Sequence, residues 1–293
     1  MTEKEIVNIG IDLGTTFSSI AVYNQTTNQF ECLTDPQDKS AIPSWVSFSE
    51  SETRIKVGYA AKEDPKSEFV VYDIKKVIGR EHMRIEKKSS ESWPFEVQND
   101  GDSTSIKVYT EQSMKHNNKE LFKPEEISAI VLSYLINIFK YRKPNCEVGR
   151  VVVTFPAQFS QAQRSAIETT CRLVQKTTYG LEGLSNITRI NEPTAAVLEY
   201  QRLLRLNGKE ELKNGSKILV IDFGGGTLDI NFCTLNFNRV TVEKNGGDQD
   251  FGGNNFDFVI QDIIKEKIKD QTGIENYIEC PINSEPSEQQ KYS

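Results

Sequence analysis

Residues 219–227 read LVIDFGGGT, and they repeat the pattern of residues 9–16, which read IGIDLGTT. In each stretch an apolar run typical of a buried strand ends on an aspartate, Asp12 or Asp222, and a glycine-rich turn follows. A second strand-like run comes after each turn. The repeat predicts two related halves, each of which carries an aspartate and a glycine turn at the end of a strand.

These paired turns suit phosphate and magnesium chemistry. Glycine has no Cβ, so the backbone can approach a phosphate closely, and successive N–H groups form an anion-binding nest. Magnesium prefers oxygen ligands and keeps several waters, so two aspartates can position the hydrated ion beside a triphosphate. Thr15, Thr16 and Thr227 add hydroxyl donors. Either copy alone is equally well read as an ordinary hairpin turn, and the second copy is what favours a phosphate site.

Two other nucleotide-binding motifs do not fit the sequence. No lysine follows the glycines in the way that a phosphate-binding P-loop requires. The dinucleotide-binding fingerprint needs a helix after its glycines, whereas a strand-like run follows each turn here. A P-loop fold and a dinucleotide-binding fold are therefore disfavoured.

Composition narrows the class of protein. The chain has 293 residues, of which 37% are hydrophobic and 26% charged, as in ordinary globular proteins with one two-lobed domain or two domains. A net charge of −7 without a basic stripe argues against nucleic acid and anionic membranes as partners. The start carries Glu3 and Glu5 where a signal peptide has basic residues, and five scattered cysteines indicate reduced thiols. We expect a cytoplasmic protein, with the nucleus as an alternative.

The order of strand and helix patterns predicts an α/β fold. Short alternating runs over residues 6–48 read as an antiparallel meander, and residues 99–102 as a hairpin turn. Pro124 opens a helix whose apolar residues recur at helical spacing, and this apolar region is too short to cross a bilayer. Two strand–helix pairs follow, at residues 150–175 and 187–206. The polar connection that comes next divides the chain into residues 1–206 and 207–293.

Five segments carry a resemblance to a known family. IGIDLGTTFSSIAVYN, VVVTFPAQFSQAQRSA, INEPTAAVLEY, VIDFGGGTLDI and DFGGNNFD resemble, in order and spacing, the 70 kDa heat-shock chaperones of the actin-like ATPase superfamily. The resemblance runs from about residue 6 to about residue 270. It implies a ribonuclease-H-like α/β fold duplicated into two lobes, with ATP or ADP in the cleft between them. A sugar or acetate kinase of the same superfamily fits these segments less well.

The resemblance also implies roles for individual residues. Lys75 matches the lysine that orients the γ-phosphate and the attacking water, although a lone lysine is more often solvated. Glu192 matches an acidic residue near metal and water, and it also suits a helix N-terminus. The implied catalytic set is Asp12, Lys75, Glu192, Asp222 and Thr227, and the metal set is Asp12, Glu192, Asp222 and Asp229, with Asp229 directed to potassium.

The remaining implied roles concern phosphate contacts and signalling. Phosphate turns are implied at Gly14, Thr15 and Thr16, at Gly224, Gly225, Gly226 and Thr227, and at Gly252 and Gly253. Pro156 and Arg164 match positions that relay the nucleotide state, whereas Arg164 alone reads as a surface helix residue.

After about residue 270 the resemblance ends, so we expect a chain truncated within the nucleotide-binding domain. The family's later adenosine contacts and its peptide-binding domain have no counterpart, and the incomplete second lobe should expose a sheet edge and apolar surface. The expected function is a stress-related protein-folding chaperone that hydrolyses ATP with Mg²⁺, and with K⁺ as a further candidate, weakly or only with a partner. J-domain co-chaperones and nucleotide exchange factors are the expected partners, and direct client binding is not expected. The alternative is a non-catalytic interaction module or degenerate paralogue.

Overall fold

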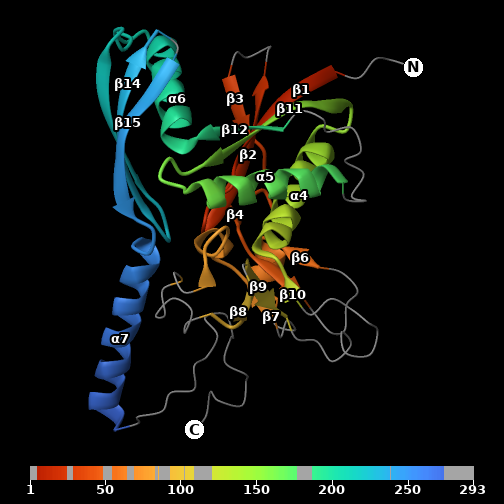
Figure 1. Cartoon of the computed structure of the whole chain (residues 1–293), viewed down its shortest axis with the longest axis vertical. Helices are drawn as coiled ribbons and strands as arrows, with labels where there is room; N and C mark the ends of the chain where they lie inside the picture. Colours follow the sequence, from red (N-terminus) through yellow and green to blue (C-terminus); the bar gives the residue numbers. More distant parts are fainter. Residues whose placement is uncertain are drawn as a thin grey trace.

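The computed structural model describes residues 5–24, 29–48, 55–64, 69–82, 85, 93–101, 103–108, 121–176, 187–237 and 239–273. Its largest sheet has six strands in the order β12-β11-β1-β2-β3, with β4 beside β2 (Figure 1). The strands are β1 (Glu5–Asp12), β2 (Phe17–Asn24), β3 (Gln29–Cys32), β4 (Ile42–Pro43), β11 (Cys146–Phe155) and β12 (Ile187–Asn191).

The strand directions in this sheet define the fold. β1 runs antiparallel to β2 and parallel to β11, and β12 is parallel to β11. β3 returns antiparallel to β2, which confirms the predicted meander over the first three strands, whereas residues 46–48, predicted as part of it, form a strand of a separate sheet. A 3-2-1-4-5 order in which only the second strand opposes the other four is that of ribonuclease-H-like folds. The fold class expected from the sequence is therefore confirmed.

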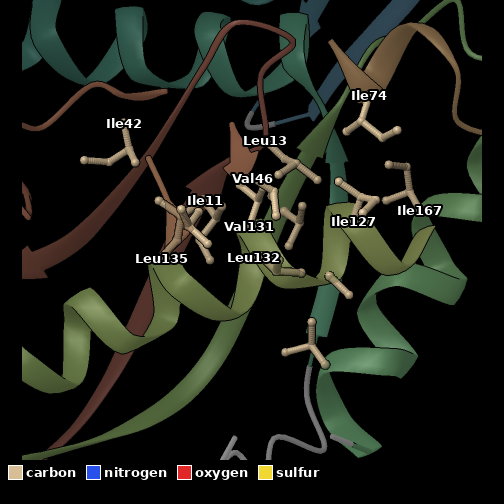
Figure 2. Packing of buried hydrophobic residues seen from close by; sticks show 14 of the residues in the cluster. Ile11, Leu13, Ile42, Val46, Ile74, Ile127, Val131, Leu132, Leu135 and Ile167 are labelled. Atoms are coloured by element: carbon tan, nitrogen blue, oxygen red, sulfur yellow. The ribbon is translucent and has the colours of Figure 1, made fainter. Parts of the chain in front are cut away.

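Two helices cover this sheet and enclose the core. α4 (Pro124–Arg142) and α5 (Gln161–Lys176) follow the predicted patterns closely. α4 begins at a proline, which suits the first helical turn, and Glu126 accepts a hydrogen bond from the Lys123 N–H at 2.8 Å. Figure 2 shows Ile11 of β1 beside Leu132 and Leu135 of α4, and all three side chains are buried.

None of the helices among the described residues is long and apolar enough to span a bilayer.

Two small sheets lie beyond the end of the large one (Figure 1), and a short 3₁₀ helix belongs to the same part of the chain. The predicted hairpin is present, because β8 and β9 pair antiparallel around Gly101, whose φ is 69°. The elements here are β5 (Val46–Phe48), β6 (Lys56–Val57), α1 (Tyr59–Lys62), β7 (Phe69–Val71), η1 (Ile74–Lys76), β8 (Glu96–Asp100), β9 (Ser103–Lys107) and β10 (Leu121–Phe122).

A second copy of the opening meander follows α6 (Glu192–Leu206). It consists of β13 (Ser216–Phe223), β14 (Leu228–Asn236) and β15 (Arg239–Asp248), which form an antiparallel sheet, and α7 (Gly253–Thr272). The registers of the two copies agree, because Asp12 lies opposite Ser19 and Asp222 opposite Asp229. α6 contacts both β12 and the second sheet, so it lies between the two (Figure 1). The internal repeat is therefore structural.

The two copies differ in how much apolar surface they bury. Ile11 is 1% exposed, whereas Ile221, at the equivalent place in β13, is 62% exposed. Among the described residues no strand pairs with β13 at the edge where β11 pairs with β1, and α7 has no buried residue. The exposed edge and apolar surface predicted for this half are confirmed within the described part of the chain.

This difference predicts unequal effects of the same substitution at equivalent positions. Ile11→Ala should lower the free energy of unfolding by about 3 kcal/mol, because it leaves a cavity in the core. Ile221→Ala should lower it by less than about 1 kcal/mol, because the side chain is already in contact with water. Urea unfolding of both variants checks this, and equal losses would contradict it.

Candidate functional site

The two predicted phosphate turns lie against each other. A Cβ built on Gly225 would fall 2.2 Å from Thr16 Oγ1, and one built on Gly226 would fall 2.8 Å from Thr15 Cγ2. Real Cβ atoms do not approach other atoms so closely, so these two positions require glycine. The turns after β1 and β13 thus meet at one place, as the repeat predicts.

Two serines that the sequence analysis did not single out brace the first turn. The Gly14 N–H donates to Ser18 Oγ at 3.1 Å, and Ser44 Oγ donates to the Gly14 carbonyl at 2.8 Å. The Ser44 N–H donates in turn to the Thr16 carbonyl at 2.9 Å. A Cβ at Gly14 would lie 2.0 Å from the Phe17 carbonyl oxygen. The first turn is therefore held in one tight conformation that excludes larger residues.

The Gly252–Gly253 turn lies on the second phosphate turn. The Gly253 N–H donates to the Gly224 carbonyl at 3.0 Å, and the Asn254 N–H donates to the Gly225 carbonyl at 2.8 Å. A Cβ at Gly252 would fall 2.6 Å from the Gly225 carbonyl oxygen. The third predicted turn therefore reaches the site through the second, at the N-terminus of α7.

An ion pair between Lys75 and Glu192 joins η1 to the start of α6. Lys75 Nζ lies 2.6 Å from Glu192 Oε1, and the two side chains are only 9% and 14% exposed. Burial lowers the pKa of Lys75, but Glu192, Asp12 and Asp229 together raise it above its ordinary value, so the lysine stays charged. Lys75 is thus a fixed buried cation, and the solvated alternative for it is wrong.

Glu192 is the member of this pair that holds its proton more tightly than usual. Burial raises the pKa of Glu192 to about 7, against the lowering effect of Lys75, and the charge of Asp12 adds to the rise. The carboxylate also lies in the first turn of α6, where the helix dipole favours a negative charge. The prediction of a helix N-terminus at Glu192 is therefore confirmed, and its role near metal and water stays a prediction.

Three aspartates complete the charged groups around Lys75. Asp12 Oδ1 accepts a hydrogen bond from Thr154 Oγ1 at 2.8 Å. Loss of hydration and the charge of Asp12 raise the pKa of Asp222. Asp229 is 4% exposed, and burial raises its pKa to about 6, against the lowering effects of Lys75, Gln158 and Thr227 nearby.

The carboxylates of this site are better suited to bind the water ligands of a magnesium ion than to ligate the ion directly. The described residues contain no group of three or more His, Cys, Asp or Glu close enough to hold an ion directly. Magnesium commonly binds one or two carboxylates, several waters and the substrate's phosphates, which two aspartates at the strand ends can serve. One carboxylate oxygen of Asp229 and Thr16 Oγ1 are buried without a hydrogen-bond partner in the structure. A bound water or ion would satisfy polar atoms of this kind, so the site is compatible with such a ligand.

Pro156 lines the site, and Arg164 supports the loop that carries Pro156. Pro156 lines the same small pocket as Lys75, Thr227 and Asp229. Arg164 donates from its Nε to the Phe159 carbonyl at 2.9 Å and from a terminal nitrogen to the Ala157 carbonyl at 2.7 Å. Arg164 therefore braces the loop after β11 that carries Pro156, and it reaches the site only through that loop.

Besides the two serines, three further contributors to this site were missed from the sequence. Lys76 is 5% exposed, lines the pocket beside Lys75 and has Asp73 at 3.9 Å. Thr154 donates a hydrogen bond to Asp12, and Gln158 lies near Asp229. Nothing in the spacing marks Lys76 as buried, because neighbouring lysines usually indicate a solvated surface. For Thr154, the alternation of side chains along β11 was the available signal.

Comparison with known proteins agrees with this geometry. The family model described as Hsp70 protein matches residues 8–280 of the chain. The chain belongs to the Hsp70 family. It is 33% identical over 273 residues to a ribosome-associated molecular chaperone of Saccharomyces cerevisiae, and 34% identical over 267 residues to a heat shock protein of Pyricularia oryzae. These alignments cover 91% and 90% of this chain but 40% of each relative, so the chain spans well under half of their length.

The raised pKa of Glu192 predicts how the stability of this Hsp70 chain depends on pH. The folded chain keeps the Glu192 proton up to about pH 7, whereas the unfolded chain releases it near the ordinary glutamate pKa of 4.5. The folded state therefore binds more protons in this window, and the free energy of unfolding should fall as pH rises through it. Glu192→Gln should remove the part of this slope near pH 7.

Asp229→Asn is the matched comparison, because the pKa of Asp229 is about 6. This variant should lose only the share of the slope that Asp229 contributes, between about pH 3.8 and pH 6, and keep the slope near pH 7. Urea unfolding at several pH values, without nucleotide or metal, measures both. A Glu192→Gln variant with the wild-type slope near pH 7 would refute the assignment.

Proposed function

We propose that this chain binds magnesium-ATP between its two glycine turns and hydrolyses it slowly to ADP and phosphate, as the nucleotide-binding part of an Hsp70-type chaperone. The observation that carries the proposal is the meeting of two duplicated turns beside a buried lysine. Gly225 packs against Thr16, and Lys75 lies among carboxylates from both halves. Membership of the Hsp70 family supports the same activity.

The turns would bind the phosphates through backbone N–H groups and the hydroxyls of Thr15, Thr16 and Thr227. Glycine at 225 and 226 lets the backbone come close without a Cβ in the way. Catalysis in phosphoryl transfer rests mainly on positioning and electrostatics, and a rigid site supplies both. The serine braces on Gly14 and the backbone bonds to Gly224 and Gly225 support this rigidity.

In the hydrolysis step, a water attacks the γ-phosphorus and the bond to the β–γ bridging oxygen breaks. Lys75 holds its positive charge beside the reacting phosphate, because Glu192 and Asp12 keep it protonated. A Mg²⁺ ion, when bound, would offset charge on the β- and γ-phosphates. Asp12 and Asp222 would orient the water ligands of that ion, and Glu192 would orient the attacking water. The unpartnered oxygen of Asp229 makes this residue the candidate ligand for K⁺.

The proposed cellular role rests on the relatives. The named yeast relatives are ribosome-associated molecular chaperones, and we propose a role in protein folding for this chain too. J-domain co-chaperones and nucleotide exchange factors are the proposed partners, in the cytoplasm or nucleus. We also propose that the two lobes divide at residues 206 and 207, after α6. Pro156 and Arg164 are proposed to carry the nucleotide state from the pocket to the α5 side of the first lobe.

Lys75→Ala tests the mechanism directly. The substitution should lower the single-turnover rate of ATP hydrolysis by about 100-fold, since it removes a charge that acts on the transition state. It should weaken magnesium-ATP binding by less than about tenfold, because the backbone contacts of the turns remain. Single-turnover hydrolysis and calorimetric titration of the same sample provide the two numbers.

Lys213→Ala is the matched control, because the Lys213 side chain is 81% exposed and pairs only with the exposed Glu210 in the residues that the structure describes. It should leave both quantities unchanged. Equal losses of binding and hydrolysis in Lys75→Ala would remove the catalytic role and leave only a binding role.

A further inference from the structure

Arg80, which is not among the predicted site residues, joins the two halves of the molecule at the edge of the pocket that Lys75 lines. It follows η1, and one terminal nitrogen lies 3.3 Å from Asp250 Oδ1 and 3.5 Å from Asp250 Oδ2. The other terminal nitrogen donates to the side-chain oxygen of Gln249. The Arg80 side chain is 10% exposed and that of Asp250 is 28% exposed. Solvent therefore screens this contact, the Arg80 bridge (Arg80, Gln249 and Asp250), less than a surface ion pair.

The first-half end of the Arg80 bridge is rigid. Thr104 Oγ1, on β9, donates to the Arg80 carbonyl at 2.8 Å. The preceding residue, Gly79, has a φ of +63°, and a Cβ there would lie 2.5 Å from Gln163 Cα on α5. Because β9 and α5 together fix the backbone at this point, the guanidinium has a firm base from which to hold its partners.

The second-half end leads directly to the phosphate turn. The Asp250 N–H donates to Asp248 Oδ1 at 2.8 Å, which orders the turn between β15 and α7. Two residues later, the Gly252–Gly253 turn packs on Gly225 and bonds the Gly224 carbonyl. Arg80 is thus connected to the second phosphate turn by a short run of backbone and two hydrogen bonds.

Asp250 is the carboxylate that pairs with Arg80, and the two nearby lysines have other carboxylates beside them. Within the described residues, Lys75 pairs with Glu192, and Lys76 has Asp73 at 3.9 Å. Arg80 and Gln249 line the same small pocket as both lysines. If Asp250 lost its charge, three cations of the first half would face this pocket with one fewer carboxylate to balance them, and the attraction between the two halves would weaken.

We propose that Arg80 is a positioning residue, which holds the second phosphate turn against the first half through Gln249 and Asp250. It acts through the Gly252–Gly253 turn and makes no contact of its own with substrate. The consequence for ATP rests on the proposed function, whereas the structural consequence does not. Loss of the Arg80 bridge should therefore loosen the turn even in the chain without nucleotide.

The nucleotide-free test uses amide hydrogen exchange at Gly253 and Asn254, whose N–H groups donate to the second phosphate turn. Arg80→Gln and Asp250→Asn should each speed exchange at these amides by about tenfold, as expected for loss of a charge-assisted hydrogen bond. The double variant should exchange no faster than Arg80→Gln alone, because that substitution already removes the ion pair that Asp250→Asn breaks. Arg172→Gln, which removes an exposed ion pair on α5, is the matched control and should change nothing.

The nucleotide test separates positioning from catalysis. Arg80→Gln should raise the KM for magnesium-ATP by about tenfold and lower kcat by less than about threefold, because the chemical groups stay in place. Arg80→Lys keeps the charge and should restore part of the affinity. Unchanged amide exchange in a folded Arg80→Gln chain would overturn the proposal. A different outcome is faster exchange in Arg80→Gln together with no ATP binding by either the variant or the wild type. That result would support the Arg80 bridge and overturn the proposed function.

Discussion

The close contact between the two glycine turns is the constraint on which the rest of the site depends. The turns after β1 and β13 come from sequence segments more than 200 residues apart, and they can meet only because neither Gly225 nor Gly226 carries a Cβ. Once they meet, Asp12 and Asp222 end at the same place. The serine braces on the first turn and the Gly252–Gly253 turn on the second then act as supports for one shared geometry.

Burying charge at this contact costs free energy unless the charges are paired. Lys75 provides the positive charge, and the carboxylates around it come from both halves. Burial raises the pKa of Glu192 and of Asp229, so the site holds more protons near neutral pH than exposed carboxylates would. A magnesium ion would balance the carboxylates, and the phosphates of a nucleotide would balance Lys75. The cost of burying these charges in the chain alone is therefore consistent with the proposed ligand.

Much of the fold could be predicted from the sequence, because local patterns decide it. The repeat of LVIDFGGGT and IGIDLGTT predicted two equivalent strand ends, and Pro124 marked the start of α4. The contacts that join distant segments could not be predicted. The burial of Lys76 and the pairing of Arg80 with Asp250 depend on how the second half lies against the first, and no local spacing encodes that. The exposure of apolar surface in the second half was predicted, and Ile221 is an example of it, whereas its equivalent Ile11 is buried beside α4 (Figure 2).

The most direct test of the account is calorimetric titration of the folded chain with magnesium-ATP, magnesium-tripolyphosphate and adenosine. We expect the glycine turns and the charges beside them to supply the free energy of binding. Magnesium-ATP and magnesium-tripolyphosphate should both bind saturably, with dissociation constants within about tenfold, or about 1.4 kcal/mol, of each other, and adenosine should not bind. A chain that circular dichroism shows to be folded, but that binds neither phosphate compound, would contradict the central claim.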